Sequence, residues 1–545
     1  MRRILQLLLL LFCITFVSCR NRSTADLIVH NALVYSVDST FRTYEAFAVK
    51  DGKFIGTGTS ADILAKYESD SVIDAGGKPV YPGFIDPHSH FLGLGKLFDE
   101  ADLTGTESFS EIIERLKAFR KTHPEKSWII GRGWDQNDWK EKQFPSKELL
   151  DKDFPDVPVL LTRIDGHAAI INSKAIELAN ITAASKMEGG LVELKNGIPT
   201  GILVDNAMGL ANKVIPQSTE KEKQQMLKNA EKACLSVGLT TVSDAGLDRA
   251  DIELIDKMHK NGSLKIRDYV MISVSPANLD YYIPKGPYAS DRLTVHSFKI
   301  YADGALGSRG ACLLKPYSDA KTSGFLLTNP KDMENYISRI AQSSFQANTH
   351  CIGDSANRLV LNLYGKYLKN KNDRRWRIEH AQVVSKDDIS KFGQFSVIPS
   401  VQPTHATSDM YWAEARLGKE RVKTAYAFKD LLDQNGKIAF GSDFPVEHFN
   451  PLYGFNSAVA RKDAKGFPPA GFQMENVVSR EAALKGMTIW AAYANFEDKN
   501  RGSIETGKWA DFVILEKDIM KIEEKELRDT RTLRTVIAGE TVFRR

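Results

Sequence analysis

Short apolar runs alternate with amphipathic stretches along the middle of the chain. Eight runs are rich in branched and aromatic residues and have the length of a buried strand: 79–85, 239–243, 264–272, 293–300, 346–349, 376–379, 396–399 and 437–440. Helical spacing lies between many of them, at 221–237, 251–260, 333–343, 357–367, 387–392 and 423–434. Strands that alternate with helices predict an α/β fold with a parallel sheet, and eight of them predict a (β/α)8 barrel.

Two parts of the chain depart from the barrel pattern. Residues 95–219 are too long for one strand-to-helix loop and contain strand and helix patterns of their own, so we predict an inserted cap there, within a barrel over 81–496. Both chain ends read as short strands, with a hairpin turn signal at Asp51-Gly52. Neither end can bury a core alone, so residues 20–80 and 497–545 are predicted to form one composite β-sandwich domain.

The first residues have the pattern of a secretion signal. Met1, Arg2 and Arg3 precede an apolar run over 4–17, which is too short to span a membrane. The run ends in Val17-Ser18-Cys19, which resembles a bacterial lipobox. We therefore expect a lipoprotein signal peptide over 1–19, with an exported protein anchored through lipidated Cys19 to a bacterial membrane, facing the periplasm or the cell surface. The alternative is an ordinary cleaved signal with a coincidental cysteine.

Composition and charge narrow the possible partners. Hydrophobic residues make up 42% of the chain and charged residues 26%, as in ordinary globular proteins. The formal net charge is +4, and no Lys/Arg cluster is interleaved with aromatic residues, so a nucleic-acid partner is not expected. The five cysteines include no CxxC spacing, which disfavours a thiolate zinc site.

Histidines stand at the ends of several predicted strands. His88 and His90 are spaced i, i+2, so both point to one face and can hold one metal ion. His350, His380 and Asp443 close three later strands. Catalytic groups of this barrel class converge at the carboxyl ends of the strands, which predicts a metal site there. The competing interpretation is a set of core histidines that hydrogen-bond to backbone carbonyls.

Lys299 lies on an inward face near the end of the fourth predicted strand. A buried ammonium is costly without a partner and cannot bind a metal. Its simplest role is a salt bridge to Asp303 or Asp443.

Several motifs together resemble the amidohydrolase superfamily, and within it amidohydrolase family 3 and the YtcJ-like branch related to N-substituted formamide deformylase. They are GRGWDQ from Gly131, DGH from Asp165, ADGALGSRG from Ala302, HCIGD from His350, QPTH from Gln402 and GSDFPV from Gly441. The resemblance covers the chain from Asp26 onward. It supports the barrel and the β domain split between the two chain ends.

The resemblance implies a ligand set for one or two divalent ions, expected to be zinc. Its members are His88, His90, Lys299, His350, His380 and Asp443, with Lys299 N6-carboxylated where it bridges two ions. Asp443 is the implied general base and acid. His167 and His405 are expected to orient the substrate or stabilise the oxyanion. Trp134 and Asp135 are expected to line the mouth of the pocket, unless they only pack within the cap.

These expectations describe an exported hydrolase of non-peptide C–N bonds that acts on a small amide- or formamide-like molecule. A metal-activated hydroxide would attack the carbonyl carbon, because bound zinc lowers the pKa of water to about 7. Deamination and cyclic-amide opening on the same scaffold are alternatives. A non-catalytic solute-binding lipoprotein is a third, and metal content separates it from an enzyme.

Overall fold

A barrel of eight parallel strands forms the centre of the molecule. The computed structural model describes residues 22–545; the predicted signal peptide and Cys19 lie outside them. Neighbouring barrel strands run in the order β10 (Phe84–Ser89), β17 (Leu239–Leu247), β18 (Arg267–Ser273), β20 (Leu293–Tyr301), β21 (Gln346–Cys351), β22 (Arg377–His380), β23 (Ile398–Val401) and β24 (Ala439–Phe440). Two hydrogen bonds bridge the seam just beyond β24, from Asp443 N to His88 O and from His90 N to Phe444 O, both at 2.8 Å. The predicted (β/α)8 barrel is confirmed.

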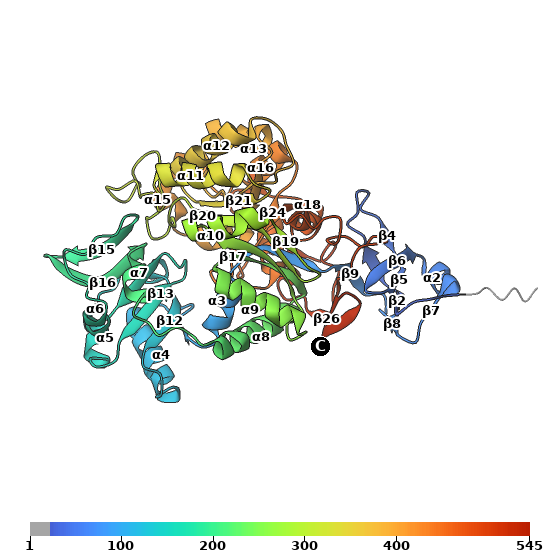
Figure 1. The fold of residues 1–545 in the computed structure, drawn as a ribbon, viewed down its shortest axis with the longest axis horizontal. Helices are drawn as coiled ribbons and strands as arrows, with labels where there is room; N and C mark the ends of the chain where they lie inside the picture. The colour runs from blue at the N-terminus through green and yellow to red at the C-terminus, as the bar shows by residue number, and fades with distance from the viewer. Residues whose placement is uncertain (1–21) are drawn as a thin grey trace, which may run out of the picture.

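Helices between the strands cover the outside of the barrel (Figure 1). Those that match predicted stretches are α8 (Glu220–Ser236), α9 (Arg249–Lys260), α11 (Pro330–Ala341), α12 (Asp354–Leu368), α13 (Lys386–Gln394) and α16 (Phe428–Asn435). Helix α8 shows why the sequence pattern works: Thr219 and Glu222 form a reciprocal capping box, and Leu227, Ala230 and Cys234 form a buried stripe. Helix α16 starts at Phe428, because residues 422–424 form a separate 3-10 turn.

The first predicted strand is in fact two strands. Residues 79–82 form β9 (Pro79–Pro82), which pairs with β25 (Phe512–Leu515) and β3 (Leu33–Tyr35) in a terminal sheet. Only β10 belongs to the barrel. Gly83 joins the two strands, and a Cβ there would lie 2.3 Å from Thr240 Oγ1, so the chain crosses from sheet to barrel where only glycine fits.

Strands from both chain ends share one core. One sheet has the order β27 (Glu540–Arg544), β26 (Thr532–Ile537), β25, β9, β3 and β4 (Thr43–Tyr44). The other has the order β6 (Lys53–Gly58), β5 (Ala46–Lys50), β2 (Leu27–His30) and β8 (Val72–Asp74). Phe47 joins the sheets, with its ring centroid 5.1 Å from that of Phe54 and 5.0 Å from that of Phe512. The N- and C-terminal segments therefore bury each other's apolar faces.

The long insertion builds a sheet of its own. Its strands run in the order β11 (Ala101–Asp102), β12 (Ile129–Trp134), β13 (Val159–Arg163), β14 (Ala168–Ile171), β16 (Ile198–Asp205) and β15 (Gly190–Lys195). Its helices are α4 (Phe109–Thr122), α5 (Glu148–Asp153), α6 (Ser173–Leu178) and α7 (Met208–Asn212). Two apolar clusters on the faces of the sheet hold this cap together. The cap lies at the end of the molecule opposite the terminal sheets (Figure 1).

Shorter elements complete the fold. They are α2 (Ser60–Lys66), α3 (Phe91–Leu97), α10 (Pro276–Tyr282), α14 (Pro403–Asp409), α15 (Ala413–Arg421), α17 (Pro451–Ala460), α18 (Arg480–Gly486), α19 (Ile489–Ala494), α20 (Glu524–Leu527), β1 (Ser23–Thr24), β7 (Tyr67–Glu68) and β19 (Tyr288–Ala289). Among residues 22–545, no helix has both the length and the apolar character that crossing a bilayer requires.

Candidate metal centre and active site

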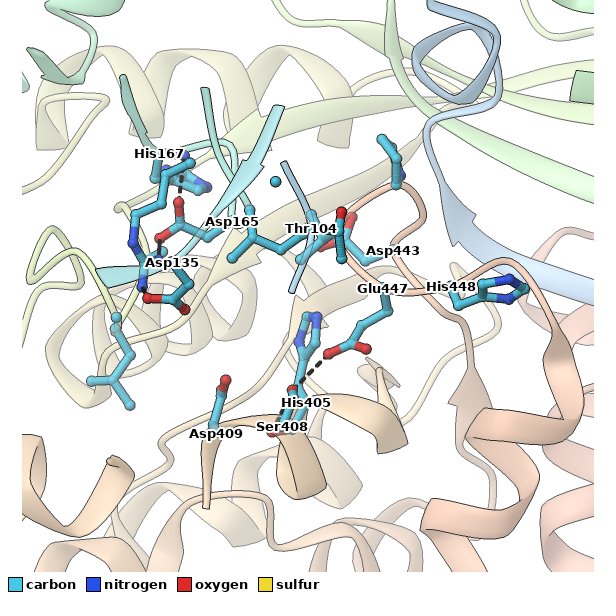
Figure 2. A pocket seen from close by; sticks show the side chains of 18 of the residues that line it. Thr104, Asp135, Asp165, His167, His405, Ser408, Asp409, Asp443, Glu447 and His448 are labelled. Atoms are coloured by element: carbon cyan, nitrogen blue, oxygen red, sulfur yellow. Dashed lines mark hydrogen bonds and ion pairs between the residues drawn. The ribbon is translucent and has the colours of Figure 1, made fainter. Parts of the chain in front are cut away.

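A cavity opens where the carboxyl ends of the barrel strands face the cap. It has a volume of about 470 Å³, and its lining includes His167, His350, His380, His405 and Asp443. Figure 2 shows His167, His405 and Asp443 around it. His350 and His380 stand on barrel strands, Asp443 stands just beyond β24, and His405 stands on α14, the helix that follows β23. His167 comes from the cap, between β13 and β14. The cavity is therefore closed by two separately folded regions.

The six ligands implied by the resemblance come together at the floor of this cavity. His88, His380 and Asp443 each offer a ligand atom, and these three atoms all lie within 4.8 Å of one another. His90 Nε2 lies 3.1 Å from Asp443 Oδ1, and His88 Nε2 lies 3.4 Å from the same oxygen. The ring centroid of His350 is 4.4 Å from that of His380.

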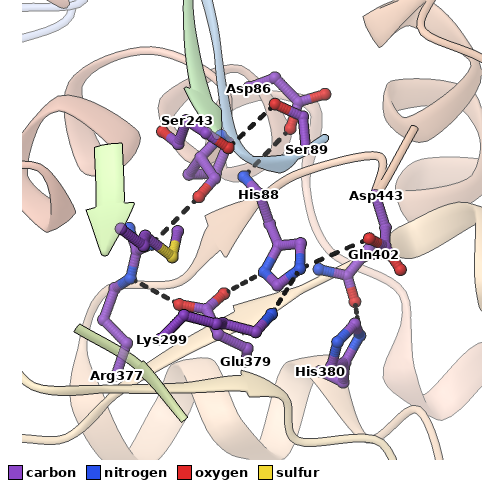
Figure 3. A network of polar contacts seen from close by, with 12 residues as sticks. Asp86, His88, Ser89, Ser243, Lys299, Arg377, Glu379, His380, Gln402 and Asp443 are labelled. Carbon is purple, nitrogen blue, oxygen red and sulfur yellow. Dashed lines mark hydrogen bonds and ion pairs between the residues drawn. The ribbon is translucent and has the colours of Figure 1, made fainter. Parts of the chain in front are cut away.

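Lys299 also points into this group. Its Nζ lies 3.1 Å from His88 Nε2 (Figure 3). The predicted salt bridge to Asp303 or Asp443 is wrong, because neither carboxylate forms an ion pair with Lys299 in the described chain. Asp303 instead accepts hydrogen bonds from the backbone N–H groups of Cys312, Ile352 and Gly353.

A second layer of side chains orients the imidazoles. His88 Nδ1 lies 2.5 Å from Glu379 Oε2, and Arg377 Nε donates to Glu379 Oε1 at 2.7 Å. His380 Nδ1 lies 2.7 Å from Gln402 Oε1. A carboxylate or amide oxygen can only accept here, so both Nδ1 atoms carry the proton and both rings present an unprotonated Nε2, the atom a metal would bind.

Of these supporting residues, Gln402 belongs to the QPTH motif and Arg377 and Glu379 to none of the motifs, and no role was predicted for any of them. Arg377 and Glu379 are spaced i, i+2 in a short strand that is otherwise apolar, so both point into the barrel interior. Buried charges need partners. That spacing, one residue before a candidate ligand, is the signal that could have identified Glu379.

Burial sets the protonation states of the site. Burial and the charge of Lys299 lower the pKa of His88 to about 4. Burial likewise lowers the pKa of His350 and of His380, and it lowers the pKa of Lys299 to about 8. Burial alone would raise the pKa of Asp443, but the hydrogen bond from His90 and the surrounding imidazoles hold it well below its usual range. The site thus presents neutral imidazoles around a carboxylate, the protonation states of metal ligands.

Unused polar atoms and an unusual backbone support a cation site. Among the described residues, His350 Nε2 is buried with no hydrogen-bond partner, and buried Asp443 Oδ1 has only the imidazole nitrogens of His88 and His90 beside it. Two members of the group have left-handed backbones, His380 with φ +74° and Asp443 with φ +61°. Such conformations cost about 1–3 kcal/mol in residues other than glycine and cluster at functional sites. The donor set of imidazole nitrogens and a carboxylate fits a divalent ion such as zinc.

The remaining residues predicted for the site lie in different environments. His167 reaches the cavity, and its ring centroid is 5.1 Å from that of His350, while its Nδ1 lies 2.6 Å from Asp205 Oδ1. His405 lies on helix α14, with its ring centroid 6.1 Å from that of His380. Asp135 also lines the cavity and pairs with Arg163.

Trp134 does not line the mouth of the cavity, so that prediction is wrong. Its side chain is fully buried in the cap core, where Nε1 donates to Leu161 O at 2.8 Å. A β-bulge is the cause: the register of β12 against β13 shifts between Arg132 and Trp134, and Gly133 has φ +114°. The extra residue turns Trp134 to the opposite face of the strand.

Comparison with known proteins agrees with this geometry. A family model described as "Amidohydrolase family" matches residues 71–543. The putative amidohydrolase YtcJ of Bacillus subtilis is 32% identical over 94% of this chain and 98% of its own length. The N-substituted formamide deformylase of Arthrobacter pascens is 25% identical over 95% of this chain and 98% of its own length.

A solved structure extends the likeness to three dimensions. An uncharacterized metal-dependent hydrolase from Pyrococcus horikoshii superposes with a TM-score of 0.75 at 28% identity, over 91% of this chain and 99% of its own. The resemblance predicted from the motifs is confirmed. The chain belongs to the amidohydrolase family.

Proposed function

We propose that this protein hydrolyses the C–N bond of a small amide- or formamide-like molecule other than a peptide. Asp443 is the observation that carries the proposal. Its ionised carboxylate faces the cavity, with Oδ1 buried and 3.1 Å from His90 Nε2. Such a group can accept a proton from a water nucleophile and pass it to a leaving nitrogen. The formamide deformylase among the relatives supports this class of bond.

The side chains suit distinct parts of that reaction. His88, His90, His350, His380 and Asp443 would hold a divalent ion, with Lys299 as a further ligand if it is N6-carboxylated. The bound ion would supply a Lewis acid and lower the pKa of water. His167 faces the ligands from the cap, where it can donate a hydrogen bond to the oxygen of the scissile carbonyl. Trp412 and Leu306 on the cavity wall exclude water from an apolar part of the substrate.

Metal removal and restoration test the proposal. The soluble form (residues 20–545) is assayed against N-formyl amines, N-acyl amines and cyclic amides as purified, after chelation, and after addition of zinc. We expect hydrolysis that disappears with the metal and returns with it. His123→Ala, which changes a half-buried cap histidine outside this cavity, is the control and should keep full activity. Metal-loaded protein that releases ammonia from an amino-purine but opens no amide would favour the deaminase alternative.

We further propose export and anchoring through Cys19. The basic start, the apolar run and Val17-Ser18-Cys19 support this. Cells that express the full chain are labelled with a palmitate analogue and fractionated. Wild type should carry label in the membrane fraction, and Cys19→Ala should lose both. Unlabelled wild type that fractionates like Cys19→Ala would contradict the anchor.

A further inference from the structure

The metal centre stands between two chambers. The cavity described above, here the apolar chamber, has a wall that includes Leu94, Leu306, Trp412 and Phe449. A second cavity of about 780 Å³, here the polar chamber, shares His167, His350, His380 and Asp443 with the first. Its remaining wall is mostly polar and includes Arg132, Glu100, Asn206, Tyr301 and Thr328. A bond held at the metal centre therefore has room for one arm on each side.

Arg132 is the distinctive group of the polar chamber. The bulge at Gly133 that turns Trp134 into the cap core leaves Arg132 on the opposite face, towards the chamber. One guanidinium nitrogen, Nη2, donates to Ile164 O at 3.1 Å, and Nε is buried without a partner. The guanidinium lies against Gly166, where an added Cβ would come within 3.2 Å of Nη2. The cation is thus held in place with donors unused.

The acidic groups around Arg132 are largely engaged elsewhere. Asp165 pairs with Arg163 at 2.5 Å, and Asp205 pairs with His167 at 2.6 Å. Glu100 lies near Arg132 but forms no ion pair with it in the described chain, and burial raises the pKa of Glu100. An arginine remains charged even when buried. Beside Lys299 at the metal centre and exposed Lys96 at the rim, Arg132 is thus the chamber cation that is held in place with donors unused, and a single guanidinium suits a carboxylate.

We propose that Arg132 binds a carboxylate of the substrate. The proposal rests on the proposed function and narrows it: the substrate is an amide with an apolar arm in the apolar chamber and a carboxylate on the arm in the polar chamber. A planar guanidinium matches a carboxylate in geometry as well as charge. Nε, which has no partner, and Nη1, which donates no hydrogen bond within the described chain, leave N–H groups available to the carboxylate.

Two probes that differ only at the acid test this assignment. N-benzoylglycine carries a carboxylate, and N-benzoylglycinamide carries a neutral amide in its place. Benzoate release by the metal-loaded protein gives kcat/KM for each probe. We expect wild type to prefer the acid by about 10- to 100-fold, the worth of a charge-assisted hydrogen-bond pair. Arg132→Met should abolish this preference and change kcat/KM for the neutral probe by less than about twofold.

Other variants keep the test decisive. Arg132→Lys should retain part of the preference, and Lys96→Met, which removes an exposed cation at the chamber rim, should retain all of it. If neither probe is hydrolysed, the proposed function fails for this class, and the same ratio is measured as Kd by calorimetry on the metal-loaded protein. No preference in wild type, or an equal loss for both probes in Arg132→Met, would overturn the carboxylate site.

Discussion

Two histidine–carboxylate pairs stand beside the same group of candidate ligands, one buried in the barrel and one from the cap. His88 Nδ1 lies 2.5 Å from Glu379, and His167 Nδ1 lies 2.6 Å from Asp205. The pKa of His88 is nevertheless lowered to about 4, through burial and the charge of Lys299. Burial also opposes the charged form of His167, but the hydrogen bond and charge of Asp205 outweigh it and raise the pKa of His167.

The difference lies in what else each pair touches. Glu379 also accepts from buried Arg377, and Lys299 stands beside His88, so cations surround the barrel imidazole. Within residues 22–545, Asp205 forms a hydrogen bond with no side chain other than that of His167, and its Oδ2 has no partner. A neutral imidazole can bind a cation, whereas a protonated one can only donate. The same pairing therefore leaves a neutral imidazole among the candidate ligands of the barrel and favours the charged, hydrogen-donating form in the cap.

Asp443, whose charge acts on both imidazoles, gives the largest expected effect. Asp443→Asn keeps the shape and an oxygen ligand but removes the proton acceptor. A positioned acid–base group contributes about 10²–10⁴-fold, so kcat should fall by that factor while the metal is largely retained. Steady-state kinetics with elemental analysis measure both. If the variant kept the wild-type kcat with metal bound, Asp443 would be only a ligand and not the proton acceptor.

Glu379→Gln tests the barrel pair. The variant leaves Arg377 buried without its counter-ion, a change that costs about 3–5 kcal/mol in comparable pairs. It also removes the acceptor that orients His88, so metal affinity should fall about 10- to 100-fold. Denaturant unfolding and zinc titration measure the two effects. Glu111→Gln, which changes a partly exposed pair with Arg115, should cost no more than about 1 kcal/mol. Equal stability losses in the two variants would contradict the buried role.

Much of this site could be predicted from sequence because its ligands stand at strand ends. A strand fixes direction by alternation, and parallel strands bring their carboxyl ends to one face. His88, His350 and His380 therefore needed only the strand pattern. The residues that support them are defined by contacts between strands that are distant in sequence. Glu379 and His88, for example, are 291 residues apart. The hydrophobic periodicity of a single strand carries no information about such a contact.

The errors have local causes that hydrophobic patterning does not register. The run at 79–85 is continuously apolar because both of its halves are buried, although they belong to different sheets. Arg132 and Trp134 are two residues apart, so a regular strand would place them on the same face. The bulge at Gly133 places them on opposite faces. Lys299 has a histidine as its neighbour where a carboxylate was expected, because backbone N–H groups already occupy Asp303.

Asp205→Asn tests the cap pair. Loss of the counter-charge should leave His167 neutral and weaken its donation, which lowers kcat/KM about 10-fold, within the range of one charged hydrogen bond. Metal stoichiometry should not change, in contrast to Glu379→Gln. His167→Gln should cost a similar factor, and the double variant should cost no more than either alone, because both act through one imidazole. Loss of zinc in Asp205→Asn would show that the cap pair, like the barrel pair, supports metal binding, and would contradict the comparison.

Asp409 extends the comparison to a cavity carboxylate with no ion-pair partner in the described chain, and it gives the smallest expected effect. It accepts hydrogen bonds from Gln382 Nε2 at 3.0 Å and from Tyr426 OH at 2.8 Å. Burial raises its pKa from 3.8 to about 7. The folded state therefore binds more protons than the unfolded state between about pH 4 and 7, and this carboxylate costs stability increasingly as the pH rises through that window.

Asp409→Asn removes that titration while its amide oxygen can still accept both hydrogen bonds. At pH 8 the variant should be more stable than wild type by up to about 2 kcal/mol, a rise of a few degrees in Tm, and at pH 4 the two should melt together. Thermal unfolding at both pH values measures the difference. Asp70→Asn, which changes an exposed carboxylate of the terminal sheets, is the control and should shift Tm at neither pH. A variant that is less stable at pH 8 would show that Asp409 is ionised and stabilising there, as a carboxylate with a cationic partner is.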